Sequence, residues 1–334
     1  MNPSLKSISI GLLLALALLT LVVGGQYAFF LLRPVTPPGQ RVVIVESGAS
    51  FNSIAHKLKE RGVIGNVANF KLLARWRDAG GHIQAGSYEF VRPATPGEVL
   101  TRLTSGDTLQ KSFTIPEGFS LSQIAEKLEA EGCGPASSFM ALAVDPDFIK
   151  SLGLEVDSLE GYLFPETYAF GPESTQDRLI RTMVRQAKKR LTPELLGQAN
   201  AVNLTEHELL TLASIIQKEA GNKEEMPIIS SVFHNRLKKG MRLQADPTVT
   251  YGLTEFSGKI TKKHLLTETP YNTYRIAGLP AGPIACPGED ALRAAANPAD
   301  TDYLYFAAKG DLTHEFSRTL EEHNAAVRKY IRKE

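Results

Sequence analysis

Residues 205–221 read Thr205-Glu-His-Glu-Leu-Leu-Thr-Leu-Ala-Ser-Ile-Ile-Gln-Lys-Glu219-Ala-Gly221 and predict one helix, from which we interpret the rest of the chain. Thr205 and Glu208 match a capping box, in which each side chain accepts a hydrogen bond from a backbone N–H of the first turn. Gly221 is the residue type that favours the left-handed conformation after a last turn. Apolar residues recur at helical spacing and predict one buried stripe: Leu209, Leu212, Ala213 and Ile216.

Glu219 lies on the apolar side of this predicted helix, in its last turn. At about 100° per residue it falls within about 60° of Leu212, Ile215 and Ile216. Burial and the negative end of the helix dipole both disfavour the charged carboxylate, so both raise its pKa. A carboxyl that keeps its proton near neutral pH suits a general acid. From this segment alone the alternative stays open: a solvent-exposed Glu that pairs with Lys223.

The composition excludes several classes of protein. The 334 residues include 37 Lys and Arg against 36 Asp and Glu, a net charge of +1, and no long basic run. We therefore expect no nucleic acid partner. The two cysteines, Cys133 and Cys286, indicate neither a metal site nor a disulfide framework, so we expect two buried thiols. Whether they pair with each other stays open.

The N-terminal segment predicts a membrane anchor. Residues 7–32 carry no charge and exceed the roughly 20 residues that a spanning helix needs. A cleaved signal peptide would have a shorter apolar region of about 7–15 residues. We expect residues 1–6 to form a cytoplasmic tail, residues 7–32 a single-pass anchor, and residues 33–40 a stiff, Pro-rich linker. Lys6 and the N-terminal amine favour a cytoplasmic N-terminus, which places the rest of the chain across the membrane.

An internal repeat follows the linker. Residues 42–62 resemble residues 112–132, and Ser87-Tyr-Glu-Phe90 resembles Thr167-Tyr-Ala-Phe170. The identities in register are Gly48/Gly118, Ser50/Ser120, Ile54/Ile124, Ala55/Ala125, Lys57/Lys127, Leu58/Leu128 and Gly62/Gly132. A constant register of this kind indicates a duplicated structural unit.

Each copy of the repeat predicts an alternating strand, a glycine turn and a Ser-capped amphipathic helix. This order is similar to that of LysM carbohydrate-binding modules, although two small spacer modules are the alternative. We expect an α+β protein with a LysM-like module over residues 41–108 and a second related module with a connector over 109–190. A mixed α/β catalytic domain over 191–334 would follow.

Polar and aromatic residues gather in several later segments. The run Leu159–Tyr168 holds two acids and three aromatic residues, which would line a sugar groove or alternate into a core. Asn222 to Glu225 reads as the capping signal of a helix that ends at Gly240. Asp246-Pro247 predicts a turn, and residues 269–288 are too rich in Pro and Gly for regular structure. We expect a strand over 302–306 and a last helix over 319–328.

No standard constellation of catalytic or cofactor-binding residues is present. The sequence has no His-Glu-x-x-His, nucleophile elbow, phosphate loop or dinucleotide fingerprint, and His314 and His323 lack a third ligand. We therefore expect no metal and no cofactor. An acid at a helix end, Gln244, Asp246 and a Tyr/Asn loop together indicate glycan cleavage. A hydrolase would need Asp246 or Glu166 as a second carboxylate, whereas a lyase that uses the substrate's own hydroxyl needs only one.

Several long motifs resemble those of the MltG/YceG-like endolytic murein transglycosylases. The resemblance covers the chain from the membrane helix to the last helix, and the motifs that carry it are Leu159–Tyr168, Ala213–Gly221, Val232–Leu237, Leu243–Val249, Pro270–Tyr274 with Gly278-Leu-Pro, and Glu322–Asn324. One departure is Ala285-Cys286, where the family usually carries Asn.

The resemblance implies a bacterial inner-membrane lyase with a periplasmic catalytic domain. Such an enzyme would cut nascent peptidoglycan between MurNAc and GlcNAc, leave 1,6-anhydro-MurNAc ends, and act with peptidoglycan synthases. In that family the residue at the position of Glu219 is the catalytic acid and base. We expect the remaining groove residues to be Glu166, Gln244, Asp246, Tyr271, Asn272, Thr273 and Tyr274. A non-catalytic glycan-binding scaffold and a hydrolytic muramidase are the competing hypotheses.

Overall fold

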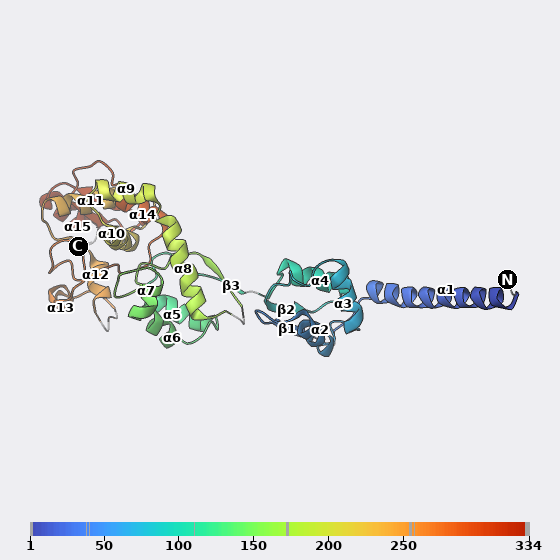
Figure 1. The fold of residues 1–334 in the computed structure, drawn as a ribbon. Coiled ribbons are helices and arrows are strands. Elements are labelled where there is room, and N and C mark those ends of the chain that lie inside the picture. Colours follow the sequence, from blue (N-terminus) through green and yellow to red (C-terminus); the bar gives the residue numbers. More distant parts are fainter. Residues whose placement is uncertain are drawn as a thin grey trace. The chain divides into compact units, whose positions relative to one another are not determined.

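The computed structural model describes residues 3–37, 39, 41–109, 111–171, 174–253, 256 and 258–330. These residues form a mixed helix and sheet protein of two compact units (Figure 1). The first unit comprises Met1–Lys111 with Ala169–Glu173, and the second comprises Ser112–Tyr168 with Ser174–Glu334. The second copy of the repeat and the predicted catalytic domain thus share one unit, so the boundary expected at residue 191 stays a sequence-based division.

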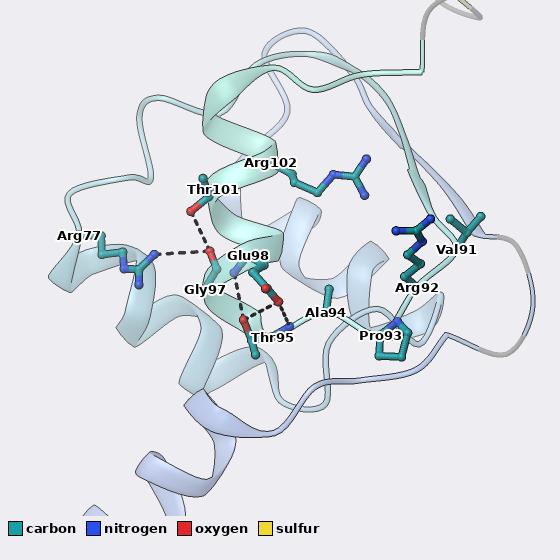
Figure 2. Close-up of a pocket in the computed structure, with 10 residues that line it drawn as sticks. All are labelled: Arg77, Val91, Arg92, Pro93, Ala94, Thr95, Gly97, Glu98, Thr101 and Arg102. Atoms are coloured by element: carbon teal, nitrogen blue, oxygen red, sulfur yellow. Dashed lines mark hydrogen bonds between the residues drawn. The ribbon is translucent and has the colours of Figure 1, made fainter.

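The chain begins with helix α1, Pro3–Leu32. Within the described part of the chain it is the one helix long and apolar enough to cross a membrane, over Leu12–Leu32. The segment after it is not a free spacer. Val35 pairs with Ala94 through two backbone hydrogen bonds of 2.9 and 3.1 Å, and Phe30 and Leu31 pack against the core of the following module. Ala94 also lines a cavity of about 730 Å³ in that module (Figure 2).

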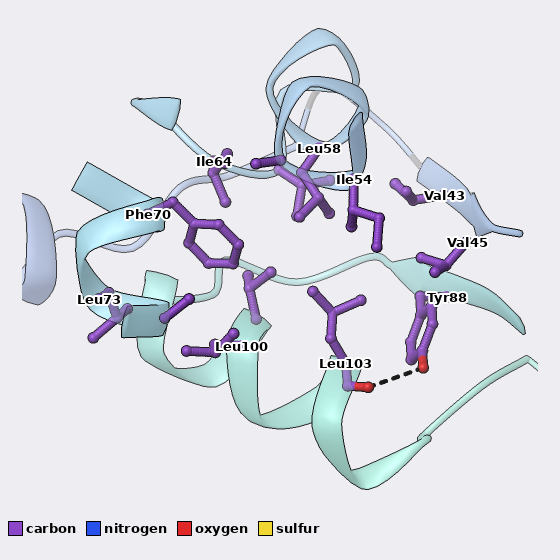
Figure 3. Packing of buried hydrophobic residues seen from close by; sticks show 14 of the residues in the cluster. Val43, Val45, Ile54, Leu58, Ile64, Phe70, Leu73, Tyr88, Leu100 and Leu103 are labelled. Carbon is purple, nitrogen blue, oxygen red and sulfur yellow. Dashed lines mark hydrogen bonds between the residues drawn. The ribbon is translucent and has the colours of Figure 1, made fainter. Parts of the chain in front are cut away.

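The first copy of the repeat folds around one apolar core. Its elements are β1 (Arg41–Val45), α2 (Phe51–Glu60), α3 (Val67–Trp76), β2 (Gly86–Phe90) and α4 (Pro96–Ser105). Strands β1 and β2 pair antiparallel with Val43 opposite Tyr88. Figure 3 shows side chains of α2, α3, α4 and both strands gathered in this core, with Phe70 on the side of Leu100 and Tyr88 on the side of Leu103. The hydroxyl of Tyr88 donates to the carbonyl of Leu103 (3.1 Å) and so secures α4 against the sheet.

The second copy repeats this local structure. It contains β3 (Lys111–Thr114), α5 (Leu121–Ala130), α6 (Ala136–Ala143), α7 (Pro146–Ser151) and β4 (Thr167–Phe170), with β3 and β4 forming a two-stranded sheet. Ser50 and Ser120 cap α2 and α5, and the preceding glycines are both left-handed. In each copy a buried tyrosine, Tyr88 or Tyr168, donates its hydroxyl to the carbonyl four residues earlier. The expected strand–turn–helix order is present in both copies, whereas their likeness to LysM modules stays a prediction.

The rest of the second unit surrounds a central helix. Its elements are α8 (Gln176–Arg190), α9 (Pro193–Ala201), α10 (Glu206–Glu219), α11 (Met226–Lys238), α12 (Asp246–Tyr251), α13 (Lys262–Leu266), α14 (Glu289–Ala296), β5 (Tyr305–Ala308), β6 (His314–Ser317) and α15 (Leu320–Tyr330). Helix α10 packs against α9, α11, α12 and α14. Every residue from Leu209 to Ile216 is buried, so α10 is buried all round and not along one stripe.

Several local predictions need correction. His314–Ser317 is a strand that pairs antiparallel with β5, which itself begins at Tyr305 and not at residue 302. Helix α11 begins later than its capping signal indicates, with Glu225 as an N-cap that has no side-chain cap. Asn222 still accepts the expected hydrogen bond from the backbone N–H of Glu225 (2.9 Å). Of the two alternatives left open for Leu159–Tyr168, burial favours the core, because Tyr162, Phe164 and Tyr168 are at most 7% exposed.

Other predictions of local structure are confirmed. Helix α11 ends at Lys238, just before Gly240, which is left-handed, and the loop from residue 269 to 288 is irregular. Cys133 and Cys286 are buried free thiols.

Candidate active site

The contacts at the two ends of helix α10 fix the position of Glu219, the last residue of the helix. At the start, the predicted capping box is present: Thr205 Oγ1 accepts from the Glu208 N–H (3.3 Å), and the Glu208 carboxylate accepts from the Thr205 N–H (2.9 Å). At the other end, the prediction that Gly221 is left-handed is wrong. A Cβ on Gly221 would lie 2.3 Å from the Leu312 carbonyl oxygen, so glycine is required there for close approach to the β5–β6 turn. Asn222 donates to the same carbonyl (2.8 Å) and fixes the contact.

Glu219 lies in a cavity of about 500 Å³ within the second unit. The walls come from the ends of α10 and α12, from α11, from the β5–β6 hairpin and from α15. The lining residues are Glu219, Arg236, Leu243, Gln244, Asp246, Tyr274, Tyr305, Phe306, Ala307, Ala308, His314, Leu320, His323, Asn324 and Val327. The structure thus brings together four residues of the predicted site, Glu219, Gln244, Asp246 and Tyr274, from three separate motifs.

The surroundings of Glu219 favour its protonated form. Burial first, and then the nearby Asp246 carboxylate, raise the pKa of this carboxyl to about 8. A hydrogen bond from the Asp246 backbone N–H and the Arg236 guanidinium act in the opposite direction and are weaker. The pKa of Glu219 is therefore shifted in the expected direction. The neighbouring Asp246 carboxylate is a cause of this shift that the sequence did not predict. The alternative pairing partner, Lys223, forms its ion pair with Asp290 instead (2.6 Å).

Asp246 and Tyr274 form a polar pair in the cavity wall. The Tyr274 hydroxyl donates to Asp246 Oδ1 at 2.6 Å. Burial first, and then this hydrogen bond, raise the pKa of Tyr274, so the phenol keeps its proton. Next to the pair, the backbone of Gln244 is left-handed (φ 51°), a conformation that residues other than glycine rarely adopt. Its backbone N–H donates to the Thr273 carbonyl (3.2 Å), which contributes to holding this strained turn in the wall.

Asn272 and Thr273 support the site and do not line it. Asn272 is 1% exposed, and its amide donates to the Thr267 carbonyl (2.6 Å) and the Leu265 carbonyl (3.2 Å). Thr273 is fully buried, and its hydroxyl accepts from the Ala245 N–H (2.9 Å). These two residues were expected to contact substrate. Their hydrogen bonds instead fold the loop that holds the residue 244–246 turn in place.

Tyr271 and Glu166 lie outside the cavity that contains Glu219. Tyr271 packs edge-on against Tyr251, with ring centroids 4.8 Å apart. Glu166 precedes β4, where its carbonyl accepts from the Ile115 N–H (3.0 Å). Its Oε2 is buried and has no hydrogen-bond partner among the described residues. Of the two candidates for the second carboxylate of a hydrolase, Asp246 therefore lines the cavity with Glu219 and Glu166 does not.

Sequence reasoning missed Arg236. This residue is 8% exposed and has no carboxylate partner in the described part of the chain. Its Nε donates to the Leu304 carbonyl (2.6 Å) and its Nη1 to the Leu243 carbonyl (2.7 Å), while its guanidinium lies over the Tyr305 ring. Arg236 belongs to the motif Val232–Leu237, but the motif gave no indication that this side chain is buried at the cavity wall.

Two histidines in the wall were also missed. His314 receives a fixed orientation from Glu225, whose carboxylate lies 2.7 Å from His314 Nδ1. His323 stacks on Tyr305, and its Nδ1 is buried without a hydrogen-bond partner among the described residues. Burial, and then Arg236, lower the pKa of His323, which favours the neutral imidazole. No group of three or more His, Cys, Asp or Glu side chains in the described ranges could hold a metal ion.

The chain matches the model of the YceG-like family over residues 43–329. The chain belongs to this family. It is 37% identical over 332 residues to a Bacillus subtilis (strain 168) protein named endolytic murein transglycosylase, across 93% of this chain and 91% of that protein.

Two further relatives extend the comparison. A Streptococcus pneumoniae (strain D39) protein of the same name is 29% identical over 368 residues, and the match covers 98% of this chain but 65% of that protein. The crystal structure of a yceG-like protein from Listeria monocytogenes superimposes with a TM-score of 0.60 at 34% identity. That superposition covers 86% of this chain and 98% of the other.

Proposed function

We propose that this protein is an endolytic peptidoglycan lytic transglycosylase with Glu219 as its only acid and base. It would cleave MurNAc–GlcNAc bonds inside nascent strands and leave 1,6-anhydro-MurNAc ends, which terminates strand elongation. The observation that carries the proposal is a carboxyl with a pKa of about 8 at the wall of a polar cavity. The name shared by its relatives in Bacillus and Streptococcus supports the same activity.

The raised pKa of Glu219 gives the first step of the reaction. The carboxyl donates its proton to the glycosidic oxygen while the bond from that oxygen to C1 of MurNAc breaks. The resulting carboxylate then takes the proton of the MurNAc 6-hydroxyl, whose oxygen forms the new bond to C1. The proton given up in the first half is thus regained in the second, and no water is consumed.

The neighbours of Glu219 have separable roles in this scheme. Asp246 keeps the acid protonated through like-charge repulsion, and the Tyr274 hydroxyl holds the Asp246 side chain in position. Gln244 and Arg236 offer hydrogen-bond donors toward the sugar hydroxyl and amide groups, and the Tyr274 hydroxyl oxygen, whose hydrogen is donated to Asp246, offers an acceptor. Tyr271, Asn272 and Thr273 act indirectly, by shaping the loop behind the turn that carries Gln244.

The surroundings of the enzyme follow from its first helix. We infer that α1 is a single-pass anchor in the bacterial inner membrane, with a cytoplasmic N-terminus and a periplasmic catalytic unit. Its apolar span of 21 residues supports this. The two repeat copies would bind glycan as LysM-like modules, and peptidoglycan synthases of elongation or division would be the partners whose products are cut.

Digestion of purified glycan strands tests the activity. Because Glu219→Gln cannot donate the proton, we expect it to lower the cleavage rate by about 10²–10⁴-fold, the usual contribution of general acid–base catalysis. Mass spectrometry of the new ends decides the mechanism, since anhydro ends indicate the lyase and reducing MurNAc ends the muramidase that uses Asp246. If wild-type protein leaves the strands intact where another lytic enzyme cuts them, the non-catalytic scaffold is correct.

The pH profile tests the electrostatic role of Asp246. Activity requires protonated Glu219, so it should fall as the pH rises through about 8. Asp246→Asn removes the like charge, lowers the pKa of Glu219, and should move this alkaline limb to lower pH. An alkaline limb that stays in place in Asp246→Asn would contradict the role of Asp246, whatever its effect on the rate.

A further inference from the structure

The first module and α1 are in direct contact at the end of the apolar span. Tyr27 of α1 lies edge-on to Trp76 at the end of α3, with ring centroids 6.0 Å apart. Phe30 and Leu31 pack against the module core, and Val35 pairs with Ala94. These contacts fix the side of the module that faces the end of α1.

This geometry sets the depth of Trp76 relative to a membrane. The span Leu12–Leu32 has 21 residues, about 31 Å at 1.5 Å per residue, which matches a hydrocarbon core of about 30 Å. Tyr27 precedes Leu32 by five residues, so it lies about 7 Å below the end of the span. A side chain that touches Tyr27 therefore lies at or below the level of the lipid headgroups.

Trp76 is exposed enough to insert into a membrane interface. Its side chain is 76% exposed in the isolated chain, and Leu72, one helical turn earlier, is 40% exposed. Trp gains most at a membrane interface, where the apolar ring leaves water and the indole N–H keeps polar partners. In water the same ring would remain an exposed apolar surface next to an apolar helix.

Arginines accompany this aromatic pair. Arg33 follows α1, Arg75 and Arg77 flank Trp76, and all three are exposed. Figure 2 shows Arg77 and Arg92 on opposite sides of the cavity of about 730 Å³. In the described part of the chain Arg92 has no ion pair or hydrogen bond, and Arg77 has only one long hydrogen bond, to the Gly97 carbonyl (3.4 Å). Both guanidinium groups therefore have donors available.

The other charged side chains that line this cavity, Arg102 and Glu98, already have hydrogen-bond partners. Arg102 donates to Asp107 Oδ2 (2.8 Å) and to the Glu89 carbonyl (2.9 Å). The Glu98 carboxylate accepts from the Thr95 N–H (2.7 Å) and hydroxyl (2.9 Å), the capping box of α4. Glu98 keeps its negative charge, but the lining also carries Arg77, Arg92 and Arg102, so the net charge of this surface is positive. A guanidinium pairs well with a phosphate group.

We propose that the first module docks on the membrane leaflet from which α1 emerges, with Trp76 in the interface and Arg77 and Arg92 on phosphate groups of anionic phospholipid. The proposal rests on the anchor inferred for α1 and goes beyond it, because an anchor alone leaves the module free in water. Docking would restrain the first unit at the membrane surface by two contacts, the helix and the module face.

The chain offers its own probe, since Trp76 is its single tryptophan. Full-length protein is reconstituted into phosphatidylcholine vesicles whose acyl chains carry bromine, which quenches indole at the depth of the bromine. We expect Trp76 emission to be blue-shifted and quenched most by shallow bromine positions. Emission of a water-exposed indole, or a shielded indole that brominated lipid does not quench, would overturn docking; the second result would indicate contact with another copy of the chain.

A paired variant separates docking from the anchor. Tyr27→Trp combined with Trp76→Phe places the only indole on α1. Quenching of this variant together with an unquenched wild type would overturn docking and leave the anchor intact. If neither indole is quenched, the anchor and the docking that rests on it both fail. The readout does not involve glycan cleavage, so the proposed activity is unaffected by either result.

A second arm tests the arginines. Brominated phosphatidylglycerol is added as a minor component to unbrominated phosphatidylcholine, and brominated phosphatidylcholine at the same fraction is the control lipid. We expect phosphatidylglycerol to quench Trp76 more strongly, because the arginines enrich it near the module. Arg77→Ala with Arg92→Ala should remove this excess, whereas Lys59→Ala, which removes an exposed charge away from the cavity, should keep it. Equal quenching by the two lipids in wild type would overturn the phosphate contact.

Discussion

The two copies of the repeat share their local structure and differ in their surroundings. Gly48 and Gly118 form the same turn, with φ of +79° and +76°. Around Gly48 the space is open, whereas a Cβ on Gly118 would touch Gln217 and Lys218, the last residues of α10 before Glu219. The second turn is also bound through its backbone, because the Gly118 N–H donates to the Cys286 carbonyl (2.9 Å).

The buried carboxyl of Glu160 gives the second copy another contact with the rest of its unit. Both oxygens of Glu160 lie within 3.2 Å of the Leu121 N–H at the start of α5, and the Tyr251 hydroxyl of α12 donates to Oε2 (3.0 Å). Burial raises the pKa of Glu160 to about 7. Similar local sequence therefore gives the same strand, turn and capped helix in both copies. The surroundings decide whether this structure lies next to α1 or contacts the helix that carries Glu219.

Truncation of one matched core leucine should give the largest difference between the copies. Leu58 and Leu128 occupy the same repeat position and are both fully buried. Replacing either by Ala should destabilise its own unit by about 2–5 kcal/mol, because it leaves a cavity in the core. Leu128→Ala should also lower glycan cleavage. Trp76 fluorescence reports the unfolding of the first unit, and circular dichroism reports the unfolding of both units. Denaturant unfolding followed by the two signals therefore shows which unit each variant destabilises. Equal loss of activity in both variants would contradict the separation of the units.

Glu160 should give the next largest effect. Glu160→Ala leaves the Leu121 N–H and the Tyr251 hydroxyl without their acceptor, which costs about 1–3 kcal/mol per buried group. Because the folded state raises this pKa from 4.5 to about 7, stability is highest below pH 4.5 and declines as the pH rises toward 7. Glu160→Gln should remove this decline.

Glu219 also has a raised pKa, so the comparison is made in Glu219→Gln protein. Thermal unfolding followed by circular dichroism between pH 4 and pH 8, roughly the range of the two shifted groups, measures the effect. A decline that persists unchanged in Glu160→Gln would show that another group causes it.

The matched glycines should give the smallest effect. Gly48→Ala and Gly118→Ala each place a Cβ in a left-handed residue, which costs about 1–2 kcal/mol. The stability loss should be similar in the two variants, since the space at Gly118 accepts a methyl group at van der Waals distance. Only Gly118→Ala should lower the cleavage rate, because a shift of its turn is transmitted to the end of α10. Unchanged activity in Gly118→Ala would mean that the second copy only stabilises the fold.

The sequence predicted the features that depend on neighbouring residues. These features are the capping box of Thr205, the end of a helix next to Gly240, the serine caps of both repeat copies and the apolar span of the first helix. All of them follow from local backbone geometry and side-chain hydrophobicity. The position of Glu219 at the end of its helix was predicted in the same way, and so was the direction of its pKa shift.

Only the tertiary structure decided which distant groups meet. Gly221 is required because Leu312 approaches it from a hairpin, and that hairpin was missed because four residues, His314–Ser317, carry too weak a strand pattern. The Tyr274–Asp246 pair, the buried Arg236 and the supporting roles of Asn272 and Thr273 depend on contacts across many residues of sequence. Local propensity acts over a few residues, whereas burial and electrostatic coupling depend on packing. The sequence therefore determined the acid and its helix, and packing determined the environment that keeps the acid protonated.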